Sequence, residues 1–121
     1  MATPDLVNVA TINGITVAGA VTTSNVDIID VAADKLFKVN VLYVSNVDGT
    51  NDATVSVSVS VDNGSNYYHL AKTVTVPADS TVAVIDKNTA VYLDETDLLR
   101  IVGSANNDLE YVCSLESLDD A

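Results

Sequence analysis

Few side chains in this sequence could act as a nucleophile, a general base or a metal ligand. The 121 residues include one histidine and one cysteine. A Ser–His–Asp relay would need His69, which alternates with Tyr68 and Leu70 in a predicted strand, and no G-x-S-x-G elbow is present to expose a serine. One His and one Cys are too few for a zinc site, and the phosphate-binding glycine motifs of nucleotide-binding proteins are absent. We therefore expect no catalytic residue, no cofactor and no enzymatic activity.

Calcium is the one metal that the sequence leaves open. Two loops, Asp48–Asp52 and Asp94–Asp97, carry the kind of oxygen ligands that calcium takes. Neither loop has the D-x-[DN]-x-[DN]-G spacing of a calcium-binding loop. Asp and Asn side chains also hydrogen-bond their own backbone in turns, which accounts for the same residues without a metal. We predict no metal site, with calcium at these loops as the alternative.

The chain is strongly acidic, since 17 Asp and Glu against 5 Lys and Arg give a formal charge of −12 at pH 7. This charge repels phosphates and disfavours nucleic-acid binding. A single cysteine, Cys113, rules out an internal disulfide. No apolar run approaches the roughly 18 residues of a membrane-spanning helix, and the N-terminus lacks the pattern of a signal peptide. We expect synthesis in a host cytoplasm and no membrane partner.

The clearest structural signal is the segment Ala53–Val61, in which valine occupies every second position from Val55 onward. Successive side chains of a strand point to opposite faces, so the valines line one face and Ser56, Ser58 and Ser60 the other. The segment is therefore predicted to be a strand with one buried and one polar face. Because so acidic a chain would place charge on a plain solvent face, we expect the serine face to lie against another sheet or a neighbouring subunit.

Short apolar runs separated by turn residues continue along the chain without helical periodicity. Beyond the N-terminal region, the predicted strands are 26–31, 36–45, 53–61, 67–76 with a bulge near 71, 81–85, 90–93, 98–102 and 109–115. Turn signals every 8–12 residues or so are typical of sandwiches and barrels. We predict an all-β, single-domain antiparallel β-sandwich, immunoglobulin-like or jelly-roll-like, with about nine or ten short strands in all.

The N-terminal region is predicted to be a β-hairpin. Two apolar runs, Val7–Ile12 and Ile15–Ala18, flank Asn13-Gly14, a strong two-residue turn signal. We divide the chain into an N-terminal hairpin or arm, 1–25, and a sandwich domain, 26–121. The hairpin could complete the home sheet or reach out to a neighbouring subunit.

Two further details follow from strand alternation. In the strand 36–45, the side chains of Phe37, Val39, Val41 and Tyr43 share one face, while Leu42 and Val44 make the other face apolar as well, so this strand is expected to be central. The acidic tail 118–121 is expected to fray.

The stretch from residue 31 to 116 resembles small virion structural proteins of tailed bacteriophages. The matching pieces are LYVSNVDGT at 42–50, LAKTVTVPADST at 70–81, VYLDETDLLRI at 91–101 and ANNDLE at 105–110, with TINGIT at 11–16 similar to the opening hairpin of such proteins. The resemblance implies a non-enzymatic β-sandwich of the virion. Among such parts, a head decoration (cement) protein that clamps major capsid subunits against internal DNA pressure fits best.

The resemblance also sets the expected partners and place: the major capsid protein and further copies of this chain, on the capsid surface of the virion, with no small-molecule substrate. Two other functions stay open, a neck, tail or baseplate component and a glycan-binding adhesion protein that would use Tyr67 and Tyr68. The predicted protein-interface residues are Ile12, Asn13, Gly14, Ile15 and Val17 of the hairpin and Ser56, Ser58 and Ser60 of the valine strand.

Overall fold

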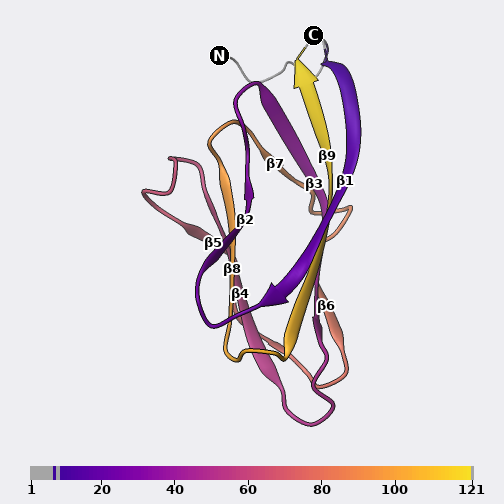
Figure 1. The fold of residues 1–121 in the computed structure, drawn as a ribbon, viewed down its shortest axis with the longest axis vertical. Coiled ribbons are helices and arrows are strands. Elements are labelled where there is room, and N and C mark those ends of the chain that lie inside the picture. Colours follow the sequence, from indigo (N-terminus) through magenta and orange to yellow (C-terminus); the bar gives the residue numbers. More distant parts are fainter. Residues whose placement is uncertain (1–6, 8, 121) are drawn as a thin grey trace.

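The computed structural model describes residues 7 and 9–120, and these residues form nine strands and no helix (Figure 1). The strands are β1 (Val9–Val21), β2 (Val26–Asp30), β3 (Lys35–Asn46), β4 (Ala53–Ser60), β5 (Tyr68–Val76), β6 (Thr81–Ile85), β7 (Val91–Leu93), β8 (Leu98–Gly103) and β9 (Leu109–Asp120). They build two sheets packed face to face, so the prediction of a single-domain antiparallel β-sandwich is confirmed.

The strand order identifies the sandwich as a jelly roll, one of the two predicted types. The first sheet has the order β1-β9-β3-β6, with β7 also paired to β3, and the second sheet has the order β2-β8-β4-β5. All pairs are antiparallel. The pairs β1/β9, β2/β8, β3/β6 and β4/β5 fall alternately in the first and second sheet, as in a ribbon of paired strands wrapped around a barrel.

The core lies between the two sheets and consists mainly of aliphatic side chains. The valine strand, now β4, contributes Val55 and Val57, which are almost completely buried, whereas Val59 is partly buried and Val61 lies beyond the strand and is exposed. Each of the other eight strands adds at least one buried hydrophobic residue to this core. The buried valine face is therefore confirmed for the first part of the strand.

The predicted bulge in the strand after the 62–66 turn is also present. The pairing of β4 with β5 shifts between Val55 and Val57, and Thr73 has a positive φ of 47°. The Thr73 N–H donates to Ser56 Oγ at 2.8 Å instead of to the ladder. A side chain of the neighbouring strand thus satisfies the backbone group that the bulge frees.

The predicted N-terminal hairpin is wrong. Val9–Val21 is one continuous strand, in which Asn13 faces Ser117 and Gly14 faces Glu116 of β9. A two-residue hairpin would need positive φ at both turn positions, and Gly64 is the one glycine with positive φ among the described residues. Pairing along the whole of β9 satisfies more backbone groups than a short hairpin could, so tertiary pairing overrides the local turn signal. Residues 1–6 and 8 of the predicted hairpin or arm lie outside the described residues, and the division of the chain into 1–25 and 26–121 stays a prediction.

Two other predictions are corrected on β3 and β9. The ladder between them shifts at Asn40, where a bulge reverses the alternation, so Leu42 and Val44 point into the core and Tyr43 is 41% exposed. The tail is not frayed through residue 120, because β9 runs to Asp120 beside β1 and β3. Residue 121 lies outside the described residues.

Candidate assembly surface

The outer face of the first sheet is a broad exposed surface of the fold. Residues directly opposite in antiparallel strands point to the same side, so the pairings place whole rows of side chains on this face. The middle rows are Ala18–Val112–Tyr43–Ala83 and Thr16–Ser114–Val41, taken across β1, β9, β3 and, for the first row, β6. Val112 is 43% exposed, so with Tyr43 it forms an apolar contact area.

Charged side chains lie in the rows that border this area. One bordering row is Ala20–Glu110–Ser45, and the other is Gly14–Glu116–Lys38. Asn40 Nδ2 donates to Glu116 Oε1 at 3.0 Å, which holds this carboxylate beside the bulge. The two middle rows themselves carry no charge, although the chain has a net charge of −12.

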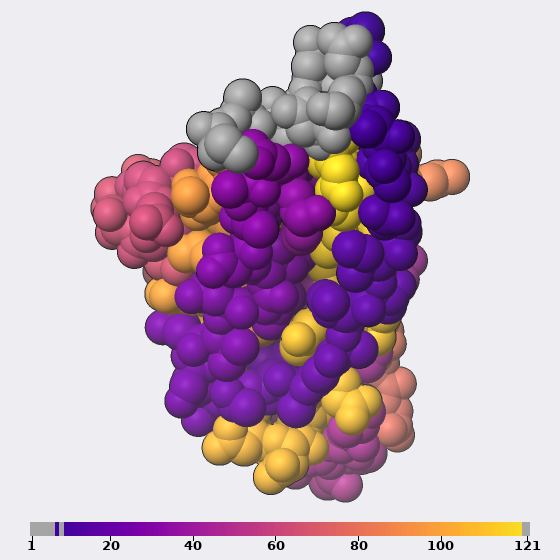
Figure 2. Space-filling model, turned by 45° about the horizontal axis from the view of Figure 1, so that its top comes forward, coloured from indigo at the N-terminus to yellow at the C-terminus, as the bar shows by residue number. Residues whose placement is uncertain are grey.

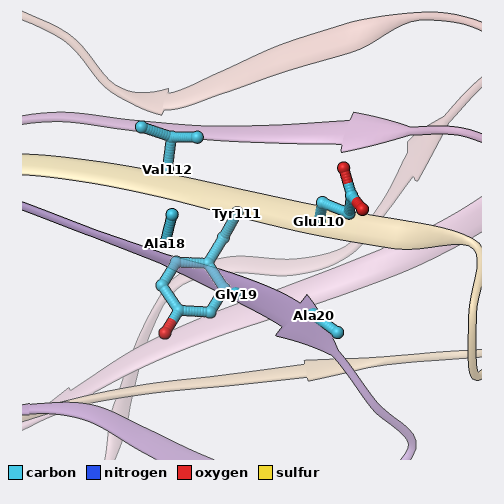
Figure 3. Close-up of a pocket in the computed structure, with 6 residues that line it drawn as sticks. All are labelled: Ala18, Gly19, Ala20, Glu110, Tyr111 and Val112. Carbon is cyan, nitrogen blue, oxygen red and sulfur yellow. The ribbon is translucent and has the colours of Figure 1, made fainter.

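A shallow depression of about 330 Å³ lies at the end of this face, over β1 and β9 (Figure 3). It is lined by Ala18, Gly19, Ala20, Glu110, Tyr111 and Val112. The Tyr111 side chain extends from β9 to Gly19, where a Cβ would lie 3.2 Å from its ring. Gly19 therefore makes room for the aromatic ring, and burial raises the pKa of the Tyr111 hydroxyl. The lining of the depression therefore holds one carboxylate, from Glu110, and one phenol, from Tyr111.

The predicted interface residues of the N-terminal region lie together on β1. The side chain of Ile12 is 60% exposed and that of Ile15 is 37% exposed, whereas Val17 is partly buried against the core. Asn13 and Gly14 are exposed as well. Among the described strands, β1 pairs only with β9, so it forms one edge of the first sheet. These residues remain candidates for contact with another subunit.

The predicted serine face lies on the second sheet, apart from β1, and its cover comes from the same chain. Ser60 is fully buried: its Oγ donates to Asp62 Oδ1 at 2.9 Å and accepts from the Gly64 N–H at 2.8 Å. Ser58 is 6% exposed and lies opposite Arg100 on β8. The turn after β4 thus folds back over Ser60, and both serines are buried within their own chain.

The Arg100 guanidinium holds the end of this covering segment. It stacks 3.6 Å from the ring centroid of Tyr67 and donates from Nε to Asp27 Oδ1 at 3.2 Å. The Tyr67 hydroxyl donates to the same oxygen at 3.1 Å. Ser56, the third predicted serine, is partly exposed and serves the bulge at Thr73. The sequence predicted a covered face. The segment that ends at Tyr67 is held by contacts with Asp27 and Arg100, and these contacts join residues separated by 40 and by 73 positions in the sequence.

The side chains that could act as a nucleophile, a base or a metal ligand do not cluster, and some are buried or already accept hydrogen bonds. His69 is exposed on β5, and Cys113 is completely buried, which raises the pKa of its thiol to about 11. The Asp48 carboxylate accepts hydrogen bonds from the N–H groups of Thr50 and Asn51, which lower its pKa. No group of three or more potential metal-ligating side chains occurs among the described residues. In the same part of the chain no helix is long and apolar enough to cross a membrane.

The acidic loop 94–97 is likewise built as a turn. Asp97 is 6% exposed, and its Oδ2 accepts the Asp94 N–H at 2.9 Å. Burial raises the pKa of the Asp97 carboxyl above its ordinary value. Glu95 Oε2 accepts the Asp34 N–H at 2.9 Å, which ties this loop to the turn before β3. The carboxylate oxygens therefore bond to backbone N–H groups rather than converge on one point.

Sequence reasoning missed the two apolar residues at the centre of the outer face, Tyr43 and Val112. Val112 follows the same alternation as the outward-facing Glu110 and Ser114, so a strict reading of period two would have found it. Tyr43 carried no such signal, because the Asn40 bulge changes which side chains of β3 point outward.

Comparisons with known proteins agree with the fold. No protein-family model matches the chain, and no curated protein is significantly similar to it in sequence. A solved structure from the endospore appendages of Bacillus, described as a novel family of disulfide-linked pili, has a TM-score of 0.51 to this chain at 14% sequence identity. The alignment covers 92% of this chain and 88% of that chain. At this identity the similarity establishes a shared β-fold, and this neighbour is not a phage protein.

Proposed function

We propose that the protein is a non-enzymatic structural subunit of a large particle, and specifically a decoration (cement) protein of a tailed-phage virion. It would bind the outside of the major capsid protein shell and stabilise it. The observation that carries the proposal is the outer face of the first sheet, where two uncharged rows include the exposed side chains of Tyr43 and Val112 on a chain of charge −12. The resemblance of residues 31–116 to virion proteins supports the same role.

In this proposal the uncharged outer face makes the contact with other subunits, and the acidic rest of the chain keeps free subunits apart. Burying apolar, uncharged rows costs no desolvation of charge, so the outer face suits a permanent contact with another protein. The acidic remainder keeps free subunits apart in solution and out of contact with nucleic acid. A protein that binds a particle in many copies needs both properties, a flat face for contact and a charged remaining surface that keeps free copies apart.

Particle reconstruction provides the first test, because a decoration protein occurs in many copies over the shell. Finding the chain in a few copies at the neck, tail or baseplate would replace the capsid proposal by the other virion role. Finding it in no particle would overturn both.

Point variants provide the second test. Tyr43→Glu and Val112→Glu place a carboxylate in the middle of the outer face, and we expect each to weaken binding to undecorated particles by roughly tenfold or more. Tyr68→Glu, on the exposed edge strand β5, is the matched control and should bind as the unaltered protein does. Binding is measured by co-sedimentation with the particles. Equal binding of all three variants would remove the outer face from the proposal.

A pilus-like filament is the second candidate function, favoured by the fold shared with the Bacillus appendage chain. Covalent linkage of the kind named for that family would require an exposed thiol, whereas Cys113 is buried and the sequence has no other cysteine. A filament of this chain would therefore form without disulfides. Electron microscopy of the purified protein tests this: filaments that also form with Cys113→Ala would support it, and dispersed particles at high concentration would reject it.

The glycan-binding alternative has weaker support. A stacking platform would use Tyr67 and Tyr68, but one side of the Tyr67 ring is covered by Arg100. Tyr68 alone is well exposed, at 64%. A glycan array without binding above background would end this alternative.

A further inference from the structure

Glu110 carries an exposed carboxylate without a partner on the outer face of the first sheet. Its side chain makes no hydrogen bond or ion pair with any other described residue. The residues directly opposite it are Ala20 on β1 and Ser45 on β3, and neither carries a charge. No cation of the described chain therefore balances this carboxylate.

Glu116, the second glutamate of β9, is compensated by its neighbours. Asn40 Nδ2 donates to its Oε1 at 3.0 Å, and Lys38 lies directly opposite it on β3. Glu116 is also partly buried, whereas Glu110 is exposed. The contrast between two glutamates on one face of one strand identifies Glu110 as the carboxylate that lacks a counter-charge.

The depression of about 330 Å³ lies directly beside this carboxylate (Figure 3). Its six lining residues are three directly opposite pairs of β1 and β9: Ala18 with Val112, Gly19 with Tyr111 and Ala20 with Glu110. In Figure 2, β1 (indigo) runs along one flank of the molecule with β9 (yellow) beside it. Because the three β1 residues are small, space stays open next to the longer side chains of β9. The depression thus combines apolar walls with one unpaired carboxylate.

Apolar walls beside a carboxylate fit the side chain of lysine or arginine. Such a side chain packs its methylene stem against apolar surface and keeps its charged end in a polar environment. At the depression the stem would lie against Ala18 and Val112, and the cation would reach Glu110, where a charge-assisted hydrogen bond is strong. If the outer face is covered by a partner, Glu110 needs this cation, because burying an unpaired carboxylate is costly.

We propose that the depression receives a lysine or arginine side chain of a different protein, whose cation pairs with Glu110. This inference rests on the proposed function and deepens it, because it states that the partner carries a cation next to the area that contacts Tyr43 and Val112. A different protein is favoured over a second copy. Two of the five Lys and Arg residues of this chain, Lys35 and Arg100, are already ion-paired, and two chains of charge −12 repel each other.

A small probe tests the site without any particle. The probe is N-acetyl-arginine amide, titrated into the isotope-labelled protein and followed by nuclear magnetic resonance. N-acetyl-citrulline amide, which is similar in shape and uncharged, is the control. We expect the arginine probe to shift the backbone amides of 18–20 and 110–112 most, and the citrulline probe to leave them nearly unchanged. The absence of these shifts, or shifts of equal size in the acidic loops 48–52 and 94–97, would overturn the proposal.

Two glutamate variants separate specific pairing from the effect of overall charge. Glu110→Gln and Glu116→Gln each remove one negative charge from the same face of β9. We expect Glu110→Gln to weaken binding of the arginine probe roughly threefold or more and Glu116→Gln to change it far less. Ala20→Leu keeps the charge but fills the depression, so it should weaken the probe as well. Equal effects of the two glutamate variants would show a general charge effect and contradict the proposal.

Binding to undecorated particles connects the site with the proposed function. Glu110→Gln should bind them roughly tenfold more weakly than Glu116→Gln, because it leaves the partner's cation unpaired inside the contact. If both variants bound as the unaltered protein does, the depression would lie outside the contact and the capsid role would stand. Absence of the chain from any particle would count against the proposed function and leave the probe titration unaffected. Self-association of the unaltered protein that Glu110→Gln abolishes would identify a second copy as the partner and overturn the choice of a different protein.

Discussion

Single residues tie together strands that lie far apart in the sequence. Lys35 Nζ and Asp119 Oδ1 are 2.8 Å apart and join the start of β3 to the end of β9. The buried Asn46 donates from Nδ2 to the carbonyl oxygens of Asn51 and Val76, and it accepts the Asp48 N–H. The ion pair holds the end of β9, which was expected to fray, and the Asn46 side chain connects the loop after β3 to the end of β5.

The Lys35–Asp119 pair predicts a pH dependence. The hydrogen bond from Lys35 lowers the pKa of Asp119 below 3.8 in the folded protein. A group with a lowered folded pKa adds stability above its unfolded pKa, and the addition is lost as the pH falls through the folded value. We expect Asp119→Asn to lower the melting temperature only slightly at pH 7, because solvent screens the pair, and to lose this difference as the pH falls through the lowered pKa of Asp119.

Comparing variant and parent at each pH removes the effect of the other carboxylates, including Asp97, whose raised pKa acts in the opposite direction. Thermal unfolding followed by circular dichroism gives the difference. A difference in melting temperature that does not shrink as the pH is lowered would show that the ion pair is not its source.

At the residue scale, alternation of side chains predicted the burial of Val55 and Val57 because each contacts neighbours whose positions follow from period two. The same reasoning identified Ser58 as a covered residue and left its cover open. Ser58 is 6% exposed and lies opposite Arg100, whose side chain donates to Asp27, and no local pattern encodes a contact across 73 positions.

At the scale of elements, strands were predictable where turn residues bound them and where alternation is unbroken. The strand Thr81–Ile85 was predicted to the residue because Pro77–Ser80 precedes it and Asp86–Thr89 follows it. The Asn40 bulge and the continuity of β1 were not predictable, since both depend on β9, about 75 or more residues away in the chain. At Asn13-Gly14 the long-range pairing with β9 overrides the local turn signal.

A pair of glycine variants tests the extended conformation of β1. In a hairpin turn, Gly14→Ala would be strained by about 1–2 kcal/mol, because positive φ disfavours a Cβ. In the observed strand it should be neutral or stabilising by up to about 1 kcal/mol, since it restricts the unfolded chain and meets no atom within 4 Å. Denaturant unfolding measures the free energy.

Gly103→Ala is the matched comparison. Its Cβ would lie 2.9 Å from Val21 and 3.2 Å from Leu109, so we expect a loss of about 1–3 kcal/mol from overpacking. If Gly14→Ala destabilised the protein as much as Gly103→Ala does, the result would favour a hairpin turn at Asn13-Gly14 over the extended strand.

At the scale of the whole molecule, the sandwich class followed from strand count and turn spacing, whereas the jelly-roll order did not. Choosing between jelly-roll and immunoglobulin-like topologies requires knowing that β1 pairs with β9 and β2 with β8, which no short stretch specifies. The residues of the assembly surface could not be predicted from the sequence for the same reason. Its central row joins Ala18, Val112 and Tyr43, which only the strand order brings together.

Deleting residues 1–21 tests whether the N-terminal region is an arm or an integral strand. The deletion removes β1, which pairs with β9 from Val9 to Val21, and it uncovers the edge beside Cys113 and Leu115. We expect the shortened protein to lose its cooperative thermal transition and to aggregate, as measured by circular dichroism and light scattering. A truncated protein that melts cooperatively near the parent temperature would support a separable arm.

The β1–β9 pairing also determines when the protein can fold. The first strand of the sandwich has its only described partner in the last strand, so the first sheet cannot close until β9 has left the ribosome. Until then β1, an uncharged strand of 13 residues, has two unpaired edges in the presence of other nascent chains. Such non-local sandwiches fold in roughly milliseconds to seconds, long enough for encounters between copies. Residues 1–90 carry a net charge of −5 and residues 91–121 a net charge of −7, so most of the repulsion between copies arises only as the last strands are made.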